Sequence, residues 1–558
     1  MAEKSLDLSR RKFMAVSSAA IAAPIFMNMA GTVPEAKGAE KKKYDFIDKK
    51  NCDLVVLGGG YSGMVAAVRG AQLSGKKVIV LEKSLSTKGF PAGGRVFGSK
   101  WQAKRNLPDT MIEYARDMMD LTYWKLDEKL VLNCLRGTGQ YFDWLCELGG
   151  DIEDMFVVGK YVHATENDPL GPQPGRDFDT FAVNMMKEKC KTYGIEVLTK
   201  HPVVDVEVEN GRIVAAVAKS EAGYVRVACK ACIMSIGSWI NNEEILKKYC
   251  PKFVGMKPYM DPSLHMNSNY TGDGISMAEK VGAFVDYDSF CLRLMGPLYD
   301  SARDKGTSKV FLSMTQSPYI ITVNLNGKRY SAEPVGHIGH FDDGHVQIEQ
   351  PHGQSFDVFD ENTLAAEFKR PKCTQTAEDT HPLACAGLTW MKPSEEIRLP
   401  ATMEEVYKSI NEGFAKRDPY MFKGNTLEEL ADNIGPSLNK KNFLETVRKY
   451  NENCEKGADW DFFKTKDSLV PITKPPYYAM FGKLMTDGAF GGVLVNPEIQ
   501  AYKRDGGLVE GFYVTGDFAS GRFINLGGVK RQVINDRSWA LSSGFLAATN
   551  AAKYLQGL

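Results

Sequence analysis

The chain has 558 residues, which exceeds one ordinary domain, and its 43% hydrophobic and 25% charged content is typical of a globular protein with a large core. Its 69 basic and 69 acidic residues cancel to a formal net charge of zero. This balance excludes the basic character of nucleic-acid-binding proteins and gives no attraction to an anionic membrane surface, so we expect no nucleic-acid partner.

The first forty-five residues have the pattern of an export signal and linker. Ser9-Arg10-Arg11-Lys12-Phe13 is a twin-arginine pattern, and the apolar run Met14–Met29 is too short and too rich in Ala and Ser to span a membrane stably. The alternative is a chance basic pair before an apolar helix. We expect export by the twin-arginine route to the periplasm or another extracytoplasmic site, with an uncleaved membrane tether left open.

The stretch from Cys52 to Ser84 has the pattern of a strand, a glycine turn, a helix and a second strand. Leu54–Leu57 and Val78–Leu81 are the two apolar strands, and an acid follows the second one. In a G-x-G-x-x-G turn the glycines permit a tight turn, let the backbone approach a pyrophosphate and allow close helix packing, while the acid binds ribose hydroxyls. The predicted dinucleotide-binding residues are Gly58, Gly60, Ser62, Gly63, Glu82 and Lys83.

The next segments continue an α/β pattern. Leu85–Gly94 is a second glycine-bearing loop that can bring backbone close to the same cofactor, and residues 108–150 have helical periodicity. Two apolar strands flank a turn at Asn210-Gly211, which predicts a β-hairpin. The predicted cofactor contacts in these segments are Gly93, Gly94 and Val204.

The eleven cysteines are odd in number and irregularly spaced, which does not indicate a disulfide framework. Cys229-Lys-Ala-Cys232 is followed by Ile233, which excludes c-type haem attachment, and no second pair supports a zinc or iron–sulfur site. We place both cysteines in one strand, Val225–Met234, as buried thiols, with a redox role as the alternative. A buried strand from Ala231 ends at Gly237, which we expect to face the cofactor.

Further motifs follow in order along the chain. They are Tyr270–Ala278 (YTGDGISMA), Val323–Glu333 (VNLNGKRYSAE), Lys474–Ala479 (KPPYYA), Gly491-Gly492, Gly511–Asp517 (GFYVTGD) and Leu526-Gly527-Gly528. With these motifs the chain resembles the flavoproteins of the fumarate reductase/succinate dehydrogenase superfamily, in the soluble branch with fumarate reductases, urocanate reductases and 3-ketosteroid dehydrogenases. The resemblance covers most of residues 50–558.

The resemblance implies an α/β fold, with a Rossmann-like FAD-binding domain and an inserted α+β capping domain. We expect residues 1–45 to be signal and linker, 46–285 and 486–558 to form the FAD-binding domain, and 286–485 to form the capping domain. The family's covalent attachment uses a histidine in the loop before the GG pair, and Ser86–Pro91 has none, so we expect noncovalent FAD.

Acids and glycines near the end of the chain extend the predicted cofactor site. Asp517 follows an apolar strand, where a carboxylate can bind a ribityl hydroxyl. A long C-terminal helix follows the L-G-G motif, and its N-terminal N–H groups can stabilise negative charge on a reduced flavin. These contacts are Gly237, Asp273, Asp517, Leu526, Gly527 and Gly528.

The predicted reaction is reduction of an activated C=C bond of an enone or acrylate type, by hydride transfer from the flavin and protonation. Because the sequence has no haem-attachment motif and no flavin-carrier domain, we expect a separate electron donor, a cytochrome or a membrane redox protein. The alternatives are a dehydrogenase of the same fold that introduces a C=C bond, and an electron-carrying flavoprotein subunit.

Three departures from the family pattern argue against fumarate. The family's substrate-binding histidine segment appears here as Asp286–Pro297, which contains Arg293 and no histidine. The family's next histidine pair is Asp487-Gly488, and its arginine before L-G-G is Asn525. A dicarboxylate needs paired cations in a closed pocket, so we expect a larger and more neutral acceptor.

The proton donor is the remaining question. The resemblance places the family's relay glutamate at Glu333, after Arg329, but no arginine follows where the family has its proton-delivering one. Instead a histidine-rich segment runs from His337 to His352, which predicts a solvated loop, a proton relay or, with poor ligand spacing, a metal site. The candidate catalytic residues are Glu333, His337, His340, Arg293, Tyr478 and Arg531.

Overall fold

The computed structural model describes residues 44–84, 93–104, 106, 109–149, 155–158, 161–165, 181–255, 259–260, 270–298, 317–333, 343–369, 402–415, 420–521 and 536–558. Residues 46–558 form one compact unit and residues 1–45 form another. The predicted twin-arginine segment therefore lies outside the described residues, and export stays a prediction.

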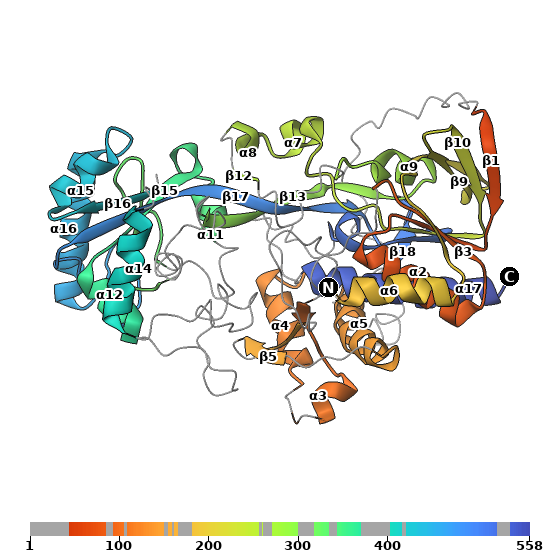
Figure 1. The fold of residues 1–558 in the computed structure, drawn as a ribbon, viewed down its shortest axis with the longest axis horizontal. Helices are drawn as coiled ribbons and strands as arrows, with labels where there is room; N and C mark the ends of the chain where they lie inside the picture. Colours follow the sequence, from red (N-terminus) through yellow and green to blue (C-terminus); the bar gives the residue numbers. More distant parts are fainter. Residues whose placement is uncertain are drawn as a thin grey trace, which may run out of the picture. The chain divides into compact units, whose positions relative to one another are not determined.

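The predicted strand–turn–helix–strand unit lies in the middle of a six-stranded sheet (Figure 1). The strands run parallel except for one antiparallel edge strand, and the central four are fully or largely buried, as expected for a parallel sheet. The two predicted strands are confirmed with the same bounds. In sheet order the strands are β18 (Gln500–Tyr502), β19 (Leu508–Val514), β11 (Ala231–Met234), β2 (Leu54–Leu57), β3 (Val78–Leu81) and β7 (Glu196–Leu198).

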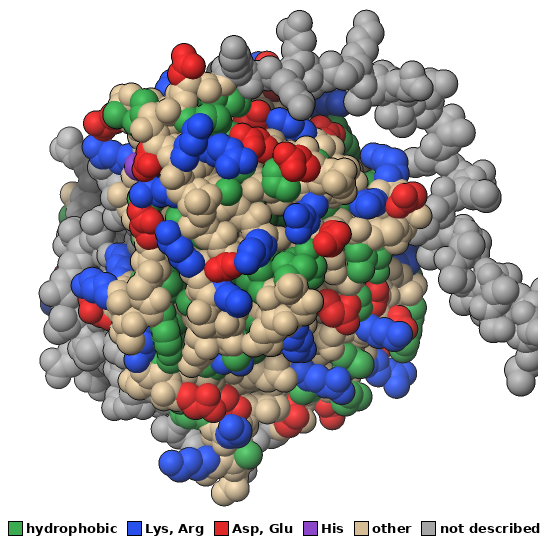
Figure 2. All heavy atoms as spheres, turned by 90° about the vertical axis from the view of Figure 1, so that its right-hand side faces the viewer, with side chains coloured by type: hydrophobic (Ala, Val, Ile, Leu, Met, Phe, Trp, Pro, Cys, Tyr) green, Lys and Arg blue, Asp and Glu red, His purple; other side chains and the backbone are tan. Residues whose placement is uncertain are grey.

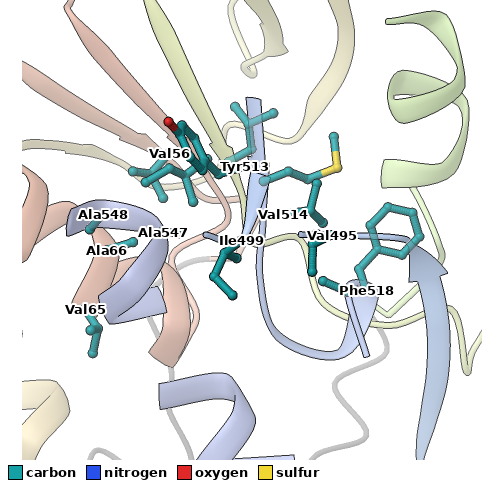
Figure 3. Close-up of a cluster of buried hydrophobic side chains, with 14 of the residues drawn as sticks. Val56, Val65, Ala66, Val495, Ile499, Tyr513, Val514, Phe518, Ala547 and Ala548 are labelled. Atoms are coloured by element: carbon teal, nitrogen blue, oxygen red, sulfur yellow. The ribbon is translucent and has the colours of Figure 1, made fainter. Parts of the chain in front are cut away.

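Two helices from opposite ends of the chain pack beside this sheet, α2 (Tyr61–Ser74) and α17 (Asp536–Gln556). Their small residues Ala66 and Ala548 face a cluster that includes Val56 and Val514 from the strands (Figure 3). A side chain added at Gly544 of α17 would lie 2.5 Å from the backbone oxygen of Ser62. The sequence thus uses glycine and alanine to bring α17 against the N-terminus of α2.

A four-stranded sheet corrects one sequence prediction. Val225–Met234 is two strands: β10 (Tyr224–Ala228) lies in this sheet, whereas β11 lies in the parallel sheet. Cys229 and Lys230 form the crossing between them, and burial raises the pKa of both the Cys229 and the Cys232 thiols. The predicted burial of both thiols is confirmed.

The same sheet confirms the predicted hairpin, because Asn210 and Gly211 both have positive φ, 51° and 72°. In sheet order its strands are β1 (Phe46–Asn51), β10, β9 (Arg212–Lys219) and β8 (Val203–Glu209). The predicted helical region 108–150 contains α4 and α5. The other elements of this half are β4 (Gly93–Arg95), α3 (Lys100–Lys104), α4 (Met111–Leu121), α5 (Glu128–Glu147), β5 (Met155–Val158), β6 (Tyr161–Thr165), α6 (Phe181–Thr192), α7 (Glu243–Tyr249), α8 (Pro251–Gly255), β12 (Tyr259–Met260) and α9 (Gly274–Lys280).

Two long antiparallel strands, β13 (Val285–Leu298) and β17 (Tyr477–Val493), run side by side (Figure 1). They cross the predicted domain boundaries at 285/286 and 485/486, so the chain passes between the predicted domains within paired strands. The division into domains stays a prediction. The other elements of the predicted cap are β14 (Ile321–Asn324), α11 (Asp343–Gln347), β15 (Gln354–Phe359), α12 (Glu361–Lys369), α14 (Met403–Ala415), β16 (Met421–Gly424), α15 (Leu427–Ile434) and α16 (Lys440–Lys456).

Charged side chains of both signs are interspersed on the face shown in Figure 2. This agrees with the zero formal net charge of the chain. Among the residues that the structure describes, none of the helices is both long and apolar enough to cross a bilayer.

Candidate functional site

The glycines of the turn after β2 have two different roles: some allow close packing of the protein, and one leaves space for a ligand. Gly58 has φ +99°, and a Cβ there would lie 2.2 Å from the backbone oxygen of Ser235. A Cβ at Gly63 would lie 2.0 Å from the backbone oxygen of Gly58. A Cβ at Gly60 would meet nothing within 4 Å. Gly58 and Gly63 therefore serve the packing of the turn, whereas Gly60 leaves open space at the N-terminus of α2, where a phosphate binds.

Glu82, the acid after β3, is tied directly to this turn. Its carboxylate accepts hydrogen bonds from the backbone N–H groups of Gly59, at 2.6 Å, and Ser84, at 2.7 Å. The residue is 8% exposed. Each carboxylate oxygen keeps a second lone pair, so Glu82 can still accept a hydrogen bond from a ligand hydroxyl.

Lys83 and Asp273, two predicted cofactor residues, are brought together as an ion pair. Lys83 Nζ lies 2.8 Å from Asp273 Oδ2 and donates to Thr271 Oγ1 at 3.2 Å. Thr271 Oγ1 in turn donates to Asp273 Oδ1 at 2.7 Å. The pair joins the segment after β3 to the N-terminus of α9, and so fixes one wall of the site.

Gly237, Asp517 and Tyr270 lie at the same edge of the sheet. Gly237 follows β11 with φ +87°, and a Cβ there would lie 2.8 Å from Cε1 of Tyr270. Burial, together with the charges of Asp517 and Glu82, raises the pKa of Tyr270. Three carboxyl-terminal strand ends thus converge on one half-buried phenol.

The turn that carries Asp517 is held by α17. Gly516 N–H donates to Ser543 Oγ at 3.0 Å, and Trp539 Nε1–H donates to the Gly516 oxygen at 2.8 Å. The predicted contact between α17 and the cofactor through Leu526, Gly527 and Gly528 concerns residues outside the described part, and α17 as described begins at Asp536.

The predicted cofactor residues Ser62 and Val204 differ in where their side chains lie. The Ser62 hydroxyl packs at α17, because a Cβ at Gly544 would lie 2.7 Å from it, so only the Ser62 backbone lies in the turn. Val204 is 41% exposed on β8, the edge strand of the four-stranded sheet. The backbone N–H of His201, three residues before Val204, donates to the backbone oxygen of Glu82 at 2.8 Å, so the segment leading into β8 lies close to Glu82.

Several predicted residues cannot be placed by their side chains. Gly93 and Gly94 begin β4, and no contact of theirs with the glycine turn is described. Arg293 is described as backbone in β13, where it pairs with Gly488 of β17. The predicted residues outside the described part are His337, His340, Leu526, Gly527, Gly528 and Arg531.

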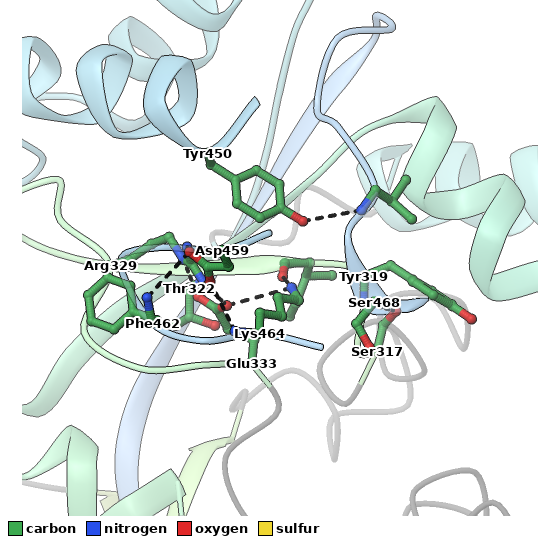
Figure 4. A network of polar contacts seen from close by, with 12 residues as sticks. Ser317, Tyr319, Thr322, Arg329, Glu333, Tyr450, Asp459, Phe462, Lys464 and Ser468 are labelled. Atoms are coloured by element: carbon green, nitrogen blue, oxygen red, sulfur yellow. Dashed lines mark hydrogen bonds and ion pairs between the residues drawn. The ribbon is translucent and has the colours of Figure 1, made fainter. Parts of the chain in front are cut away.

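Glu333 lies inside a buried ion network (Figure 4). Arg329 donates to both oxygens of Glu333, at 2.9 and 2.7 Å, and to Asp459 Oδ2 at 2.9 Å. Glu333 Oε1 also accepts from the Thr322 N–H at 2.9 Å, and Lys464 Nζ lies 3.6 Å from Glu333 Oε2. All four charged side chains are at most 4% exposed.

Burial lowers the pKa of Lys464 to about 8, although the charge of Glu333 opposes this shift. Lys464 Nζ also donates to the Ile320 oxygen at 2.5 Å. Two cations and two carboxylates therefore compensate one another here, and the arrangement holds the segment 317–333 to the turn at Asp459.

Tyr478 lies in a hydrophobic cluster of the predicted cap. It is 1% exposed and stacks on Phe359 with ring centroids 5.3 Å apart. Gly488 lies ten residues further along β17. Leu57 and Met64, which flank the glycine turn after β2, belong to a different hydrophobic cluster from Tyr478, so the structure does not bring Tyr478 together with that turn.

Tyr270 is the site residue that the sequence analysis did not select. The only signal for it was its place directly before the T-G-D-G motif. Among the described residues, no group of three or more His, Cys, Asp or Glu side chains could hold a metal ion.

The open space at Gly60, the ribose-type acid Glu82 and the second acid Asp517 fit a dinucleotide with polyol groups on both sides of its phosphates. The sequence profile of the family described as "FAD binding domain" matches residues 53–528. The chain belongs to this family. It is an FAD-dependent oxidoreductase with a Rossmann-like FAD domain.

Individual relatives agree with this assignment. The vinyl phenol reductase of Lactiplantibacillus plantarum is 24% identical over 484 residues, which cover 84% of this chain and 90% of that protein. The open conformation of a flavocytochrome c3 fumarate reductase superposes with a TM-score of 0.61 at 20% identity, covering 99% of this chain and 83% of that one. A 3-ketosteroid-Δ4-(5α)-dehydrogenase from Rhodococcus jostii RHA1 superposes with a TM-score of 0.64 at 18% identity, covering 92% of this chain and 98% of that one. The two structures share the fold of this chain.

Proposed function

We propose that this protein reduces an activated C=C bond of a neutral or singly charged small molecule, of the enone or aryl-alkene type, and that fumarate is not its substrate. The observation that carries the proposal is the register of β13 and β17, in which Arg293 pairs with Gly488. The segment Asp286–Pro297, where the family pattern has a histidine, contains Arg293 and no histidine, and the family's histidine pair is here Asp487-Gly488.

The energetics of burial support this choice. A dicarboxylate that enters a closed pocket loses the hydration of two charges, and an unpaired buried charge costs several kcal/mol. Arg293 can serve one carboxylate, and Asp487 would repel the other. The similarity to a vinyl phenol reductase, an enzyme named for an unsaturated substrate that has no carboxylate, supports the same class.

Different residues of this chain would bind the cofactor and donate the proton. Bound FAD supplies the hydride. Gly60 and Glu82 hold the cofactor at the sheet edge, and the Lys83–Asp273 ion pair fixes the wall beside it. The proton donor is proposed from the sequence alone: His337 or His340, since histidine donates near neutral pH without large tuning.

The test of the reaction is an anaerobic screen of the reduced holoenzyme. Reduced viologen supplies electrons, and consumption is followed for an enone, an aryl-acrylate, a vinyl phenol and fumarate. We expect turnover of at least one neutral acceptor. The double variant His337→Gln, His340→Gln should lower kcat about 10²–10⁴-fold and keep FAD bound.

The same reduced holoenzyme can be used to distinguish two alternative functions from the proposed reductase activity. A dehydrogenase that introduces the double bond, which shares this fold in the 3-ketosteroid enzyme, would transfer electrons from a saturated ketone to a dye acceptor. An electron-carrying flavoprotein subunit would show no reoxidation by any C=C compound. Turnover only with the dye would replace the reductase proposal.

We also propose that the protein is exported by the twin-arginine route and receives electrons from a separate cytochrome or membrane redox protein. The support is the Arg10-Arg11 pair in its N-terminal context. Replacing both with Lys keeps the charge and should retain the folded, FAD-loaded protein in the cytoplasm. Unchanged delivery outside the cytoplasm would contradict export by this route.

A further inference from the structure

Tyr270 occupies a defined position in the cofactor site. Its ring lies against the α-carbon of Gly237, where an added Cβ would come within 2.8 Å of Cε1 and 3.0 Å of Cδ1. The residue is half-buried, as are Gly58, Gly60 and Asp517 around it at the sheet edge. The ring therefore lies at the carboxyl-terminal edge of the sheet, and the absence of a side chain at Gly237 lets it lie there.

The backbone around Tyr270 is fixed to the turn after β11. The Tyr270 oxygen accepts from the Asn241 N–H at 2.8 Å, and Gly272 N–H donates to the Ser238 oxygen at 3.2 Å. Asn242 Nδ2 donates to the Thr271 oxygen at 3.0 Å. These three bonds fix the backbone that carries the ring.

The sheet order places this ring between two carboxylates. The strand order β19, β11, β2, β3 arranges along one edge Asp517, Gly237, the glycine turn and Glu82. The span from β19 to β3 is three strand spacings, about 14 Å. Tyr270 on Gly237 thus lies beside the phosphate-binding turn, with one acid on each side.

The chemistry of FAD has the same order. Its ribose and ribityl hydroxyls lie on the two sides of a pyrophosphate, and carboxylates accept hydrogen bonds from hydroxyls but cannot bind phosphate oxygens. A phosphate oxygen needs a donor. The Tyr270 phenol is protonated at neutral pH and can donate, and burial together with the charges of Asp517 and Glu82 raises its pKa further.

We propose that the Tyr270 hydroxyl donates a hydrogen bond to the pyrophosphate of bound FAD and is a cofactor-binding residue of this protein. Glu82 and Asp517 then accept hydrogen bonds from the ribose and ribityl hydroxyls on either side of the pyrophosphate. The three residues thus bind a hydroxyl, a phosphate and a hydroxyl in the order in which FAD carries them. The inference rests on FAD binding and is independent of which C=C compound is reduced.

The test compares three ligands on the deflavinated full-length protein by calorimetry. Tyr270→Phe keeps the ring on Gly237 and removes the donor. We expect its Kd for FAD and for ADP-ribose to rise about 10- to 100-fold, with its Kd for adenosine unchanged. Tyr270→Ala should be at least as weak. The control is Tyr554→Phe, which loses a 2.7 Å bond to Glu510 at the other end of β19 and should bind all three ligands normally.

Each other outcome overturns the proposal. Unchanged FAD affinity in Tyr270→Phe would mean that the hydroxyl does not touch the cofactor. Tighter FAD binding in Tyr270→Ala would mean that the ring only fills the empty site and must leave it. An equal loss for adenosine and ADP-ribose would place the contact on the nucleoside.

Discussion

The cofactor edge of the parallel sheet and the buried network of the predicted cap use the same residue types in opposite ways. In the network, Arg329 donates to both oxygens of Glu333 and also to Asp459, and every charged side chain is at most 4% exposed. At the sheet edge, the hydrogen bonds that Glu82 accepts from described residues come from backbone N–H groups, and Asp273 and Lys83 remain 35% and 21% exposed.

This difference distinguishes charged side chains that stabilise the fold from charged side chains that can bind a ligand. Buried ions that compensate one another hold two segments together, and their hydrogen-bonding groups are used by one another and not by a substrate. A carboxylate such as that of Glu82, which accepts from backbone N–H groups beside an open glycine turn, keeps lone pairs for a ligand. The variants below test this division, because a structural charge should affect stability alone and a ligand-binding position should affect cofactor affinity alone.

The largest effect is expected for Arg329→Met. This change leaves Glu333 and Asp459 buried without their shared partner, and should lower the free energy of unfolding by about 3–5 kcal/mol. Denaturant unfolding measures it. The control is Arg448→Met on α16, where the ion pairs with Glu445 and Glu452 are about half exposed and should contribute much less to the free energy of unfolding. Equal effects of the two variants would contradict the structural role of the network.

Next in size is the contrast between two glycines of one turn. Gly63→Ala forces a methyl group to within 2.0 Å of the Gly58 oxygen and should lower the free energy of unfolding by about 1–3 kcal/mol. Gly60→Ala meets no protein atom and should leave the stability of the deflavinated protein within about 0.5 kcal/mol of the parent. It should nevertheless weaken FAD binding, because the methyl group enters the space for the phosphate. Normal FAD affinity in Gly60→Ala would place the cofactor elsewhere.

A smaller effect should appear in the pH dependence of stability. The pKa of Lys464 falls from 10.5 to about 8 on folding, so between these values the unfolded chain binds a proton that the folded protein has released. Stability contributed by this group therefore rises with pH across that window and is constant below it. Lys464→Met should abolish the rise, whereas the exposed Lys466→Met should keep it. Identical pH profiles of parent and Lys464→Met would contradict the shift.

The parallel core could be predicted from the sequence because its signals are local. The G-x-G-x-x-G spacing and the apolar runs at Leu54–Leu57 and Val78–Leu81 each fit within a few residues, and both strands have the predicted bounds. The hairpin turn at Asn210-Gly211 is equally local, since both residues favour positive φ.

The errors arise where tertiary pairing decides. Val225–Met234 has no Gly or Pro to mark an end, and the break at Cys229-Lys230 exists because Val227 pairs with Lys50 and Cys232 with Val55, in two different sheets. Tyr270 could not be selected because its role depends on Gly237, far from it in sequence.

The most direct measurement of the central claim is a single turnover of the reduced holoenzyme, followed by flavin absorbance after mixing with an aryl-alkene or with fumarate at the same concentration. The account predicts that the neutral acceptor reoxidises the flavin more than about 100-fold faster, because fumarate would bury a charge that lacks a partner. Reoxidation by fumarate at an equal or greater rate would show that the single arginine in the β13–β17 pair suffices for a dicarboxylate, and would contradict the proposed substrate class.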